Sequence, residues 1–224
     1  MNTKLIVALI ALTTVLTLSL PSLAELLHES VAATGNENSS TSLFSNKPEV
    51  ERPCDLEILK ITGKSYKVEE ELRELTETGR ETSGFFKTDT GGMLELSLAS
   101  GAMAVIYPET ELKIFSNHNA GVIDIVILNG EIEFLTSKQG GKKIRVLADG
   151  LCTNPDSANF RIVFNPAVDS GKIAVRSGMI RVTSEKEPNR YFSLPTLFCL
   201  HFSEGKLQIP HRAETKEYTW KLNQ

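Results

Sequence analysis

One short pattern recurs five times in this chain of 224 residues, and it limits the folds that the chain can adopt. Each copy alternates apolar and polar residues, reaches a polar residue followed by glycine, and then alternates again. Side chains two residues apart share one face of a strand, so each copy predicts two half-buried strands joined by a tight turn. The glycines at the centres of the copies are Gly101, Gly130, Gly150, Gly178 and Gly205.

The repeated pattern predicts an all-β fold. Glycine adopts the positive φ angles of tight turns without steric cost, so Gly101, Gly130 and Gly178 are expected to be structural turns. Short strands with frequent turn signals are typical of a compact sandwich or jelly-roll-like module, or of a short β-solenoid built from repeated hairpins. The spacing of the glycines is too irregular for a strict solenoid repeat, and the sequence does not separate these architectures further.

The first 24 residues have the features of a signal peptide. Lys4 provides a positive start, residues 5–20 form an apolar stretch without charge, and small residues, Ser22 and Ala24, occupy the two positions that an A-x-A-type peptidase site requires. We expect cleavage after Ala24 and a periplasmic or secreted protein with no stable membrane insertion; the alternative is an uncleaved anchor. Only four residues precede the apolar stretch, so no cytoplasmic domain is expected before it.

Composition divides the rest of the chain. Residues 25–53 are rich in Ser and Asn and predict a flexible tether, because such a segment buries too little apolar surface to offset its ordering entropy. Residues 54–212 carry the repeated pattern and predict the β domain, and residues 213–224 form a charged tail. The formal net charge of the chain is −4, and a net negative charge does not attract the negatively charged backbone of nucleic acid.

The chemistry-bearing residues show no reactive arrangement. Cys152 and Cys199 lie on expected strands and are a candidate disulfide pair. The alternative is that both are free thiols, because cysteines on strands are also common as small buried hydrophobic residues. None of the histidines has the sequence spacing of a metal site, so solvated side chains and no metal or cofactor are expected. The four histidines are His28, His118, His201 and His211.

Several carboxylates alternate with apolar neighbours and are therefore expected to face water: Glu95, Asp124, Glu131 and Glu133. A glycosidase needs two carboxylates held across a sugar, and the sequence singles out no such pair. The nucleophile and nucleotide-binding motifs are missing as well, so no enzymatic activity is expected. Tyr107 and His118 are candidate binding residues because they lie in expected loops, which display function on a rigid scaffold.

The stretch from Gly92 to Ser184 resembles the FecR domain of bacterial envelope proteins. Residues 92–114 look like that family's strand, Ser-Gly turn, strand and Pro-x-Thr-x-Leu phrase, and residues 125–136 look like its next strand pair. Residues 144–153 and 172–183 look like the last two hairpins. The family usually has Gly-Thr before the strand that begins at Phe160, where this chain has Ser157-Ala158-Asn159.

The resemblance implies a non-catalytic recognition module that binds an envelope protein or a cell-wall component. Signalling members of the family place a cytoplasmic anti-sigma segment before one membrane helix, and this chain resembles the periplasmic part alone. Two alternatives remain: a periplasmic component of a FecR-type signalling relay, and a polysaccharide hydrolase.

Overall fold

The described part of the protein consists of strands. The computed structural model describes residues 51–117, 121–137 and 143–214, and in these ranges it contains 17 strands and no helix, which confirms the all-β prediction. The first nine strands are β1 (Glu51–Arg52), β2 (Asp55–Thr62), β3 (Ser65–Val68), β4 (Leu72–Glu74), β5 (Gly79–Thr82), β6 (Phe85–Thr88), β7 (Met93–Leu98), β8 (Met103–Ile106) and β9 (Glu111–Asn117). The others are β10 (Val122–Leu135), β11 (Lys143–Ala148), β12 (Leu151–Asn165), β13 (Ser170–Ser184), β14 (Tyr191–Pro195), β15 (Phe198–Ser203), β16 (Lys206–Leu207) and β17 (His211–Arg212).

Some of the expected segments fall outside these ranges. The signal peptide, most of the tether, His118 and residues 215–224 are not among the described residues. The end of the expected tether does take part in the fold, because β1 pairs with Ser116 and Asn117 of β9. In the described ranges, no helix has the length and apolar character needed to cross a bilayer.

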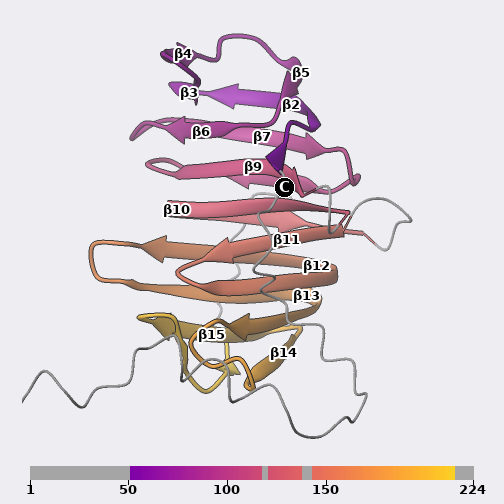
Figure 1. Ribbon diagram of the computed structural model, residues 1–224, viewed down its shortest axis with the longest axis vertical. Coiled ribbons are helices and arrows are strands. Elements are labelled where there is room, and N and C mark those ends of the chain that lie inside the picture. The colour runs from indigo at the N-terminus through magenta and orange to yellow at the C-terminus, as the bar shows by residue number, and fades with distance from the viewer. Residues whose placement is uncertain (1–50, 118–120, 138–142, 215–224) are drawn as a thin grey trace, which may run out of the picture. The chain divides into compact units, whose positions relative to one another are not determined.

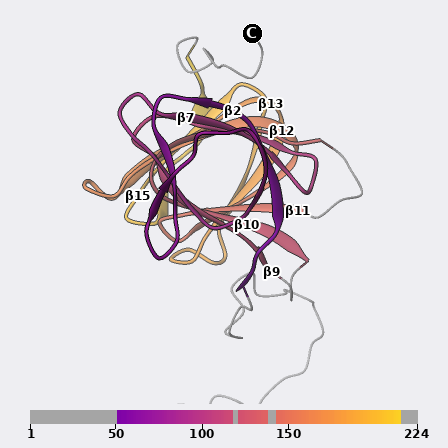
Figure 2. The same ribbon diagram turned by 90° about the horizontal axis from the view of Figure 1, so that it is seen from above.

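Backbone pairing joins the strands into one mostly antiparallel sheet, in which β10 and β11 form a parallel pair. The strands are stacked from β3 and β4 at one end to β14 and β15 at the other (Figure 1). Seen along the stack, they wind around a central region (Figure 2). Two sides of this winding can be followed through the pairings, and we call them layer A and layer B.

Layer A contains, in order of pairing, β4, β3, β6, β9, residues 122–129 of β10, β11, residues 151–156 of β12, residues 179–184 of β13, and β14. Layer B contains β5, β2, β7, β8, residues 130–135 of β10, residues 159–165 of β12, residues 170–177 of β13, β15 and β17. The long strands β10, β12 and β13 therefore belong to both layers, and each bends where it passes from one to the other.

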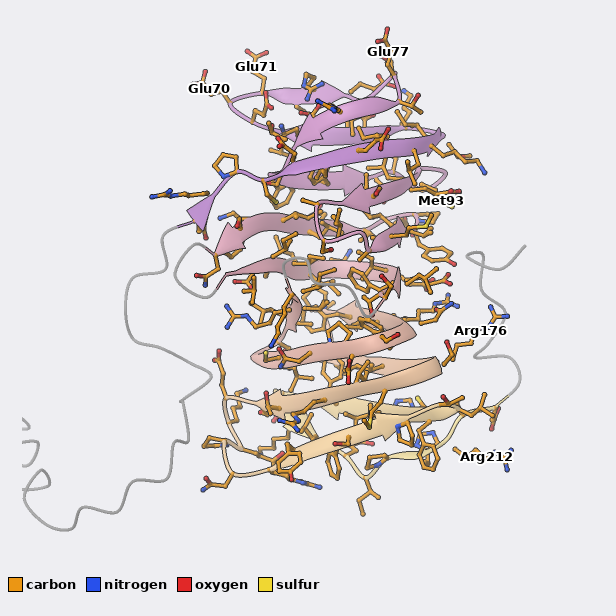
Figure 3. All side chains as sticks on the ribbon, turned by 90° about the vertical axis from the view of Figure 1, so that its right-hand side faces the viewer. Glu70, Glu71, Glu77, Met93, Arg176 and Arg212 are labelled. Atoms are coloured by element: carbon orange, nitrogen blue, oxygen red, sulfur yellow. The ribbon has the colours of Figure 1, made fainter. Side chains whose placement is uncertain are left out.

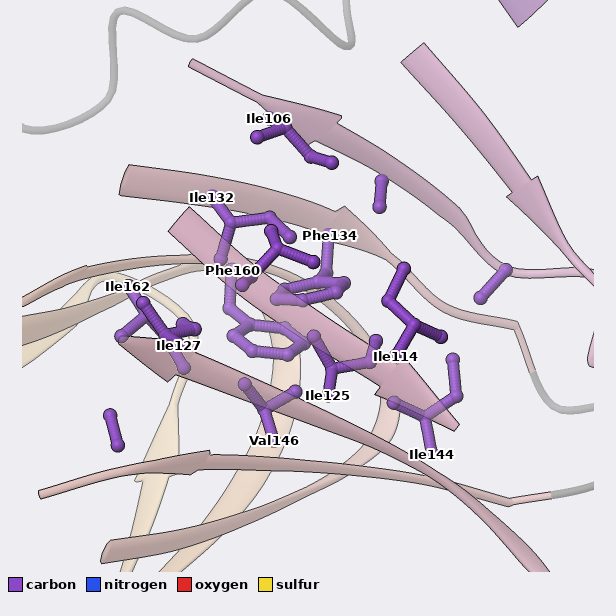
Figure 4. Close-up of a cluster of buried hydrophobic side chains, with 14 of the residues drawn as sticks. Ile106, Ile114, Ile125, Ile127, Ile132, Phe134, Ile144, Val146, Phe160 and Ile162 are labelled. Atoms are coloured by element: carbon purple, nitrogen blue, oxygen red, sulfur yellow. The ribbon is translucent and has the colours of Figure 1, made fainter. Parts of the chain in front are cut away.

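The core lies between the two layers. Alternate side chains of both layers point inward and form one buried apolar cluster, part of which is drawn in Figure 4. In layer B, the rings of Phe134 and Phe160 stack with their centroids 5.0 Å apart, and they share this cluster with Ile125 and Val146 of layer A. Burial of this apolar surface is the main favourable term in folding.

The bends correct part of the sequence interpretation. Gly101 lies in a true hairpin turn between β7 and β8, with a φ of 79°. The hairpins predicted around Gly130 and Gly178 are wrong, because each of these glycines lies inside one continuous strand, at the bend. Both still need glycine's freedom, since their φ angles are 98° and 80°. At the bend in β12, Ser157 adopts a φ of 50° where the FecR pattern has glycine.

Charged side chains project from both ends of the stack. Glu70, Glu71 and Glu77 project from the end formed by β3, β4 and β5, whereas Arg212 lies at the end formed by β15 and β17 (Figure 3). All four side chains are exposed.

Replacing Gly130 tests the bend in β10. A Cβ at this position would lie 2.3 Å from Oγ1 of Thr110 and 2.6 Å from its Cα, and the positive φ is strained for a β-branched residue. We expect Gly130→Val to lower the free energy of unfolding by more than about 1 kcal/mol in a urea titration. Gly91→Ala is the matched control, because a Cβ there meets no atom within 4 Å. An unchanged midpoint for Gly130→Val would contradict the bend.

Candidate functional site

The outer face of layer B carries the groove that we take as the candidate site. Residues that alternate with the core side chains Ile132 and Phe134 point outward, and Glu131 and Glu133 are among them. The groove has a volume of about 850 Å³. Its polar lining comes from β10, β12, β13, β15 and the segment after β16, and it includes Glu131, Arg161, Asn165, Lys172, His201 and Gln208.

Strand register explains why these side chains meet. Glu131 pairs with Val163, Val163 with Lys172, and Lys172 with His201, which makes one row across the layer. A second row runs beside it from Glu133 through Arg161, Ala174 and Cys199 to His211. Residues directly opposite each other in neighbouring strands have side chains in contact distance, so the two rows form one continuous surface.

Tyr107 lies at the edge of this surface, beside the groove. Its hydroxyl donates a hydrogen bond of 2.8 Å to Oε2 of Glu133, and the guanidinium of Arg161 lies 5.1 Å from the centre of its ring. Arg161 also forms an ion pair with Glu131. The predicted binding residue Tyr107 is thus held in a charged network, and the arginine that it contacts lines the groove.

Two carboxylates predicted to face water are buried. Glu133 and Asp124 both have an exposed fraction of 0 %. Asp124 accepts hydrogen bonds from Nε and Nη2 of Arg145 at 2.6 and 2.7 Å, and another from Asn117. A buried carboxylate is costly unless it is hydrogen-bonded and paired, so these partners are what allow the two acids to remain in place.

The predicted disulfide is not formed. Cys54, Cys152 and Cys199 are all buried thiols, and no disulfide joins cysteines of the described residues. Cys152 lies in the layer A part of β12, whereas Cys199 lies in β15 of layer B. Burial raises the pKa of the Cys152 thiol, which disfavours the reactive thiolate.

The structure gathers a group of soft metal-binding side chains that the sequence analysis missed. Cys199, His201 and His211 place their donor atoms within 4.8 Å of one another. The two imidazole rings stack with centroids 5.2 Å apart and an angle of 14° between their planes. His201 also lines the layer B groove, so the cluster and the groove share a side chain.

The carboxyl groups of Asp149 and Asp169 lie close together, each in a turn between two strands. Asp149 is in the turn between β11 and β12, and its Oδ2 accepts a hydrogen bond of 2.5 Å from the backbone N–H of Gly205. Burial and the carboxylate of Asp169, which lies within hydrogen-bonding distance, raise the pKa of Asp149, while the Gly205 bond opposes them. A glycosidase holds its two carboxyl groups about 5 to 9.5 Å apart with the sugar between them, so this pair is too close for that arrangement.

Comparison with known proteins gives a match at the level of the fold. No family model matches the chain, and no curated protein matches it by sequence. Its fold is similar to two crystal structures of a candidate anti-sigma factor from Parabacteroides distasonis. One is 13% identical, with a TM-score of 0.52, over 61% of this chain and 63% of that chain. The other is 14% identical, with a TM-score of 0.52, over 60% of this chain and 62% of that chain.

The structural match covers only part of each protein. The chain spans less than two thirds of the length of the protein that it resembles. At this identity the similarity establishes a shared β fold, and the chain is similar in fold to a protein considered an anti-sigma factor.

Removing the hydroxyl of Tyr107 tests the buried network around Glu133. Tyr107→Phe takes one hydrogen-bond donor from a buried carboxylate, so we expect a loss of about 1 to 2 kcal/mol of unfolding free energy. Tyr191→Phe is the matched control, since Tyr191 is 61% exposed and lies on the outer face of β14. Equal urea midpoints for the two variants would contradict a stabilising role for the hydrogen bond.

Replacing Asp149 tests the contact between the two carboxyl groups. Because the pKa of Asp149 is raised in the folded protein, the folded state favours its protonated form. This contribution to stability is fully present below the ordinary aspartate pKa of about 3.9, and it is lost as the pH rises through the raised value. Asn keeps an acceptor for Gly205, tolerates the φ of 49°, and carries no charge.

We therefore expect Asp149→Asn to be more stable than the original chain at about pH 7, with the difference shrinking towards pH 4. Urea midpoints across this range measure the effect. Asp156→Asn, at an exposed position, is the control and should show no such trend. The same result for both variants would contradict the carboxyl contact.

Proposed function

We propose that this chain is an exported, non-catalytic recognition domain that acts in a FecR-type signalling relay. The observation that carries the proposal is the fold similarity to a candidate anti-sigma factor over about three fifths of the chain. The FecR-like order of motifs from Gly92 to Ser184 is consistent with it and lies within the stacked strands. The expected signal peptide supports a periplasmic location for this domain.

The layer B groove is the surface that we propose for partner binding. Its lining combines apolar side chains, such as Val163 and Val168, with the charged side chains of Arg161 and Lys172. Such a mixture is typical of transient protein interfaces, in which arginine and aromatic residues are enriched. The groove also lies on paired strands, which hold its side chains in fixed positions.

A cell-envelope binding module without a signalling role is the second candidate. It shares the groove and the location, and it differs in its partner, which would be a wall component or an unrelated envelope protein. The two candidates are separated by what the domain binds and by whether its loss changes transcription.

A charge reversal in the groove tests the proposed surface. We would express the tagged full chain in its own organism, cross-link it, and identify the bound proteins by mass spectrometry. For Lys172→Glu we expect recovery of the partner to fall about tenfold or more, because reversed charge complementarity slows association and weakens the complex. Lys143→Glu is the matched control, since Lys143 is an exposed lysine of β11 in layer A.

The identity of the partner decides between the two candidates. The relay predicts an outer-membrane receptor or a membrane-anchored regulator, and a changed transcript level for a small set of genes when the gene for this chain is deleted. Recovery of wall fragments together with unchanged transcripts would overturn the relay and favour the second candidate.

A further inference from the structure

We propose that Cys199, His201 and His211 form a zinc site on the outer face of layer B, between β15 and β17. The inference rests on the placement of these three side chains, and it does not depend on the proposed signalling role. It differs from the expectation from sequence that no histidine of this chain belongs to a metal-binding set.

The strand geometry brings the three donors together. Cys199 and His201 are two residues apart on β15, so their side chains share one face of the strand. His211 on β17 pairs directly with Cys199 in antiparallel register. Leu200 and Phe202, which alternate with them, point into the core, which places the three donors on the outer face.

The donor set and its spacing suit zinc. Thiolate sulfur and imidazole nitrogen are the ligands that zinc prefers in proteins, with bond lengths near 2.3 and 2.0 Å. A tetrahedral ion with these bonds separates its donors by about 3.3 to 3.5 Å. The donors of this cluster all lie within 4.8 Å of one another, so small side-chain rotations bring them to that spacing.

The surroundings shield one ligand and leave the others accessible. Cys199 has an exposed fraction of 0 % and packs with Ala174 and Ala213, whereas His201 is half-buried and His211 is exposed. Lys172 lies opposite His201 on β13 and is an unfavourable neighbour for a cation. The thiol releases its proton to solvent when zinc binds, and the resulting thiolate offsets this positive charge.

Three protein ligands leave a fourth position on the ion, which a water molecule or a partner's side chain would complete. Since His201 also lines the layer B groove, this position lies next to the groove. β17 is a strand of two residues that pairs with β15 at two positions. Zinc bound to His211 would therefore also link β17 to the rest of layer B. A ligand that binds the folded state stabilises it, so added zinc should raise the melting temperature.

Metal titration of the full chain in a phosphine reductant tests the site. We would add Zn²⁺ to the protein in competition with a chromophoric chelator, and Co²⁺ to a second sample. One ion per chain and a thiolate-to-cobalt charge-transfer absorption in the near ultraviolet are expected, because cobalt takes the same tetrahedral ligands and reports sulfur ligation directly.

Variants assign the ligands. Cys199→Ser, His201→Gln and His211→Gln should each weaken zinc binding by about tenfold or more, and Cys199→Ser should abolish the charge-transfer band. Cys152→Ala, a buried thiol of layer A, and His118→Gln, outside the described residues, are the matched controls and should bind as the original chain does. His211 is exposed, so its variant should retain the melting transition of the metal-free protein.

Two results would overturn the proposal. One is zinc binding that survives all three ligand substitutions unchanged. The other is a folded original chain that fails to compete with the chelator and shows no charge-transfer band with cobalt.

Discussion

The strands that belong to both layers must keep an apolar face towards the core on each side of a bend. In β10 the inward residues are Ile123, Ile125 and Ile127 before the bend, and Ile132 and Phe134 after it. The step from Ile127 to Ile132 is five residues, so the alternation changes parity within one strand. The register irregularity between Ile127 and Asn129 and the positive φ of Gly130 accommodate that change, and they allow one strand to supply the core from two sides. Without this reversal, one half of each long strand would point its apolar residues at solvent.

The same local pattern has two structural outcomes, which explains what could be predicted from sequence. Phe202 and Leu207 are also five residues apart around Glu204-Gly205, and there the chain makes a true hairpin in which the two residues face each other. Alternation therefore predicted most of the inward residues, but in β8 the residues that join the core cluster are Ala104 and Ile106 and not the alternating Met103 and Val105. Whether the glycine closes a hairpin or bends a strand depends on which strands pair on each side, and that information lies far away in the sequence.

The polar residues show a similar limit. Alternation correctly separates Asp124 and Glu133 from the core face, but it says nothing of what covers the outer face. The partners that allow the two acids to be buried, Arg145 and Tyr107, are 21 and 26 residues away in sequence. In the same way, the approach of His211 to Cys199 requires the register of β17 on β15, which no spacing rule for metal ligands contains.

The sharing of strands between layers also has a mechanical consequence. In an ordinary sandwich the two sheets are joined by loops, and they can shift against each other by side-chain repacking. Here β10, β12 and β13 connect the layers through continuous backbone, and each carries ladder hydrogen bonds on both sides of its bend. A force applied to layer B along one of these strands would act as shear on the backbone hydrogen bonds of both layers. Sliding of one layer against the other would therefore require breaking ladder hydrogen bonds as well as repacking side chains.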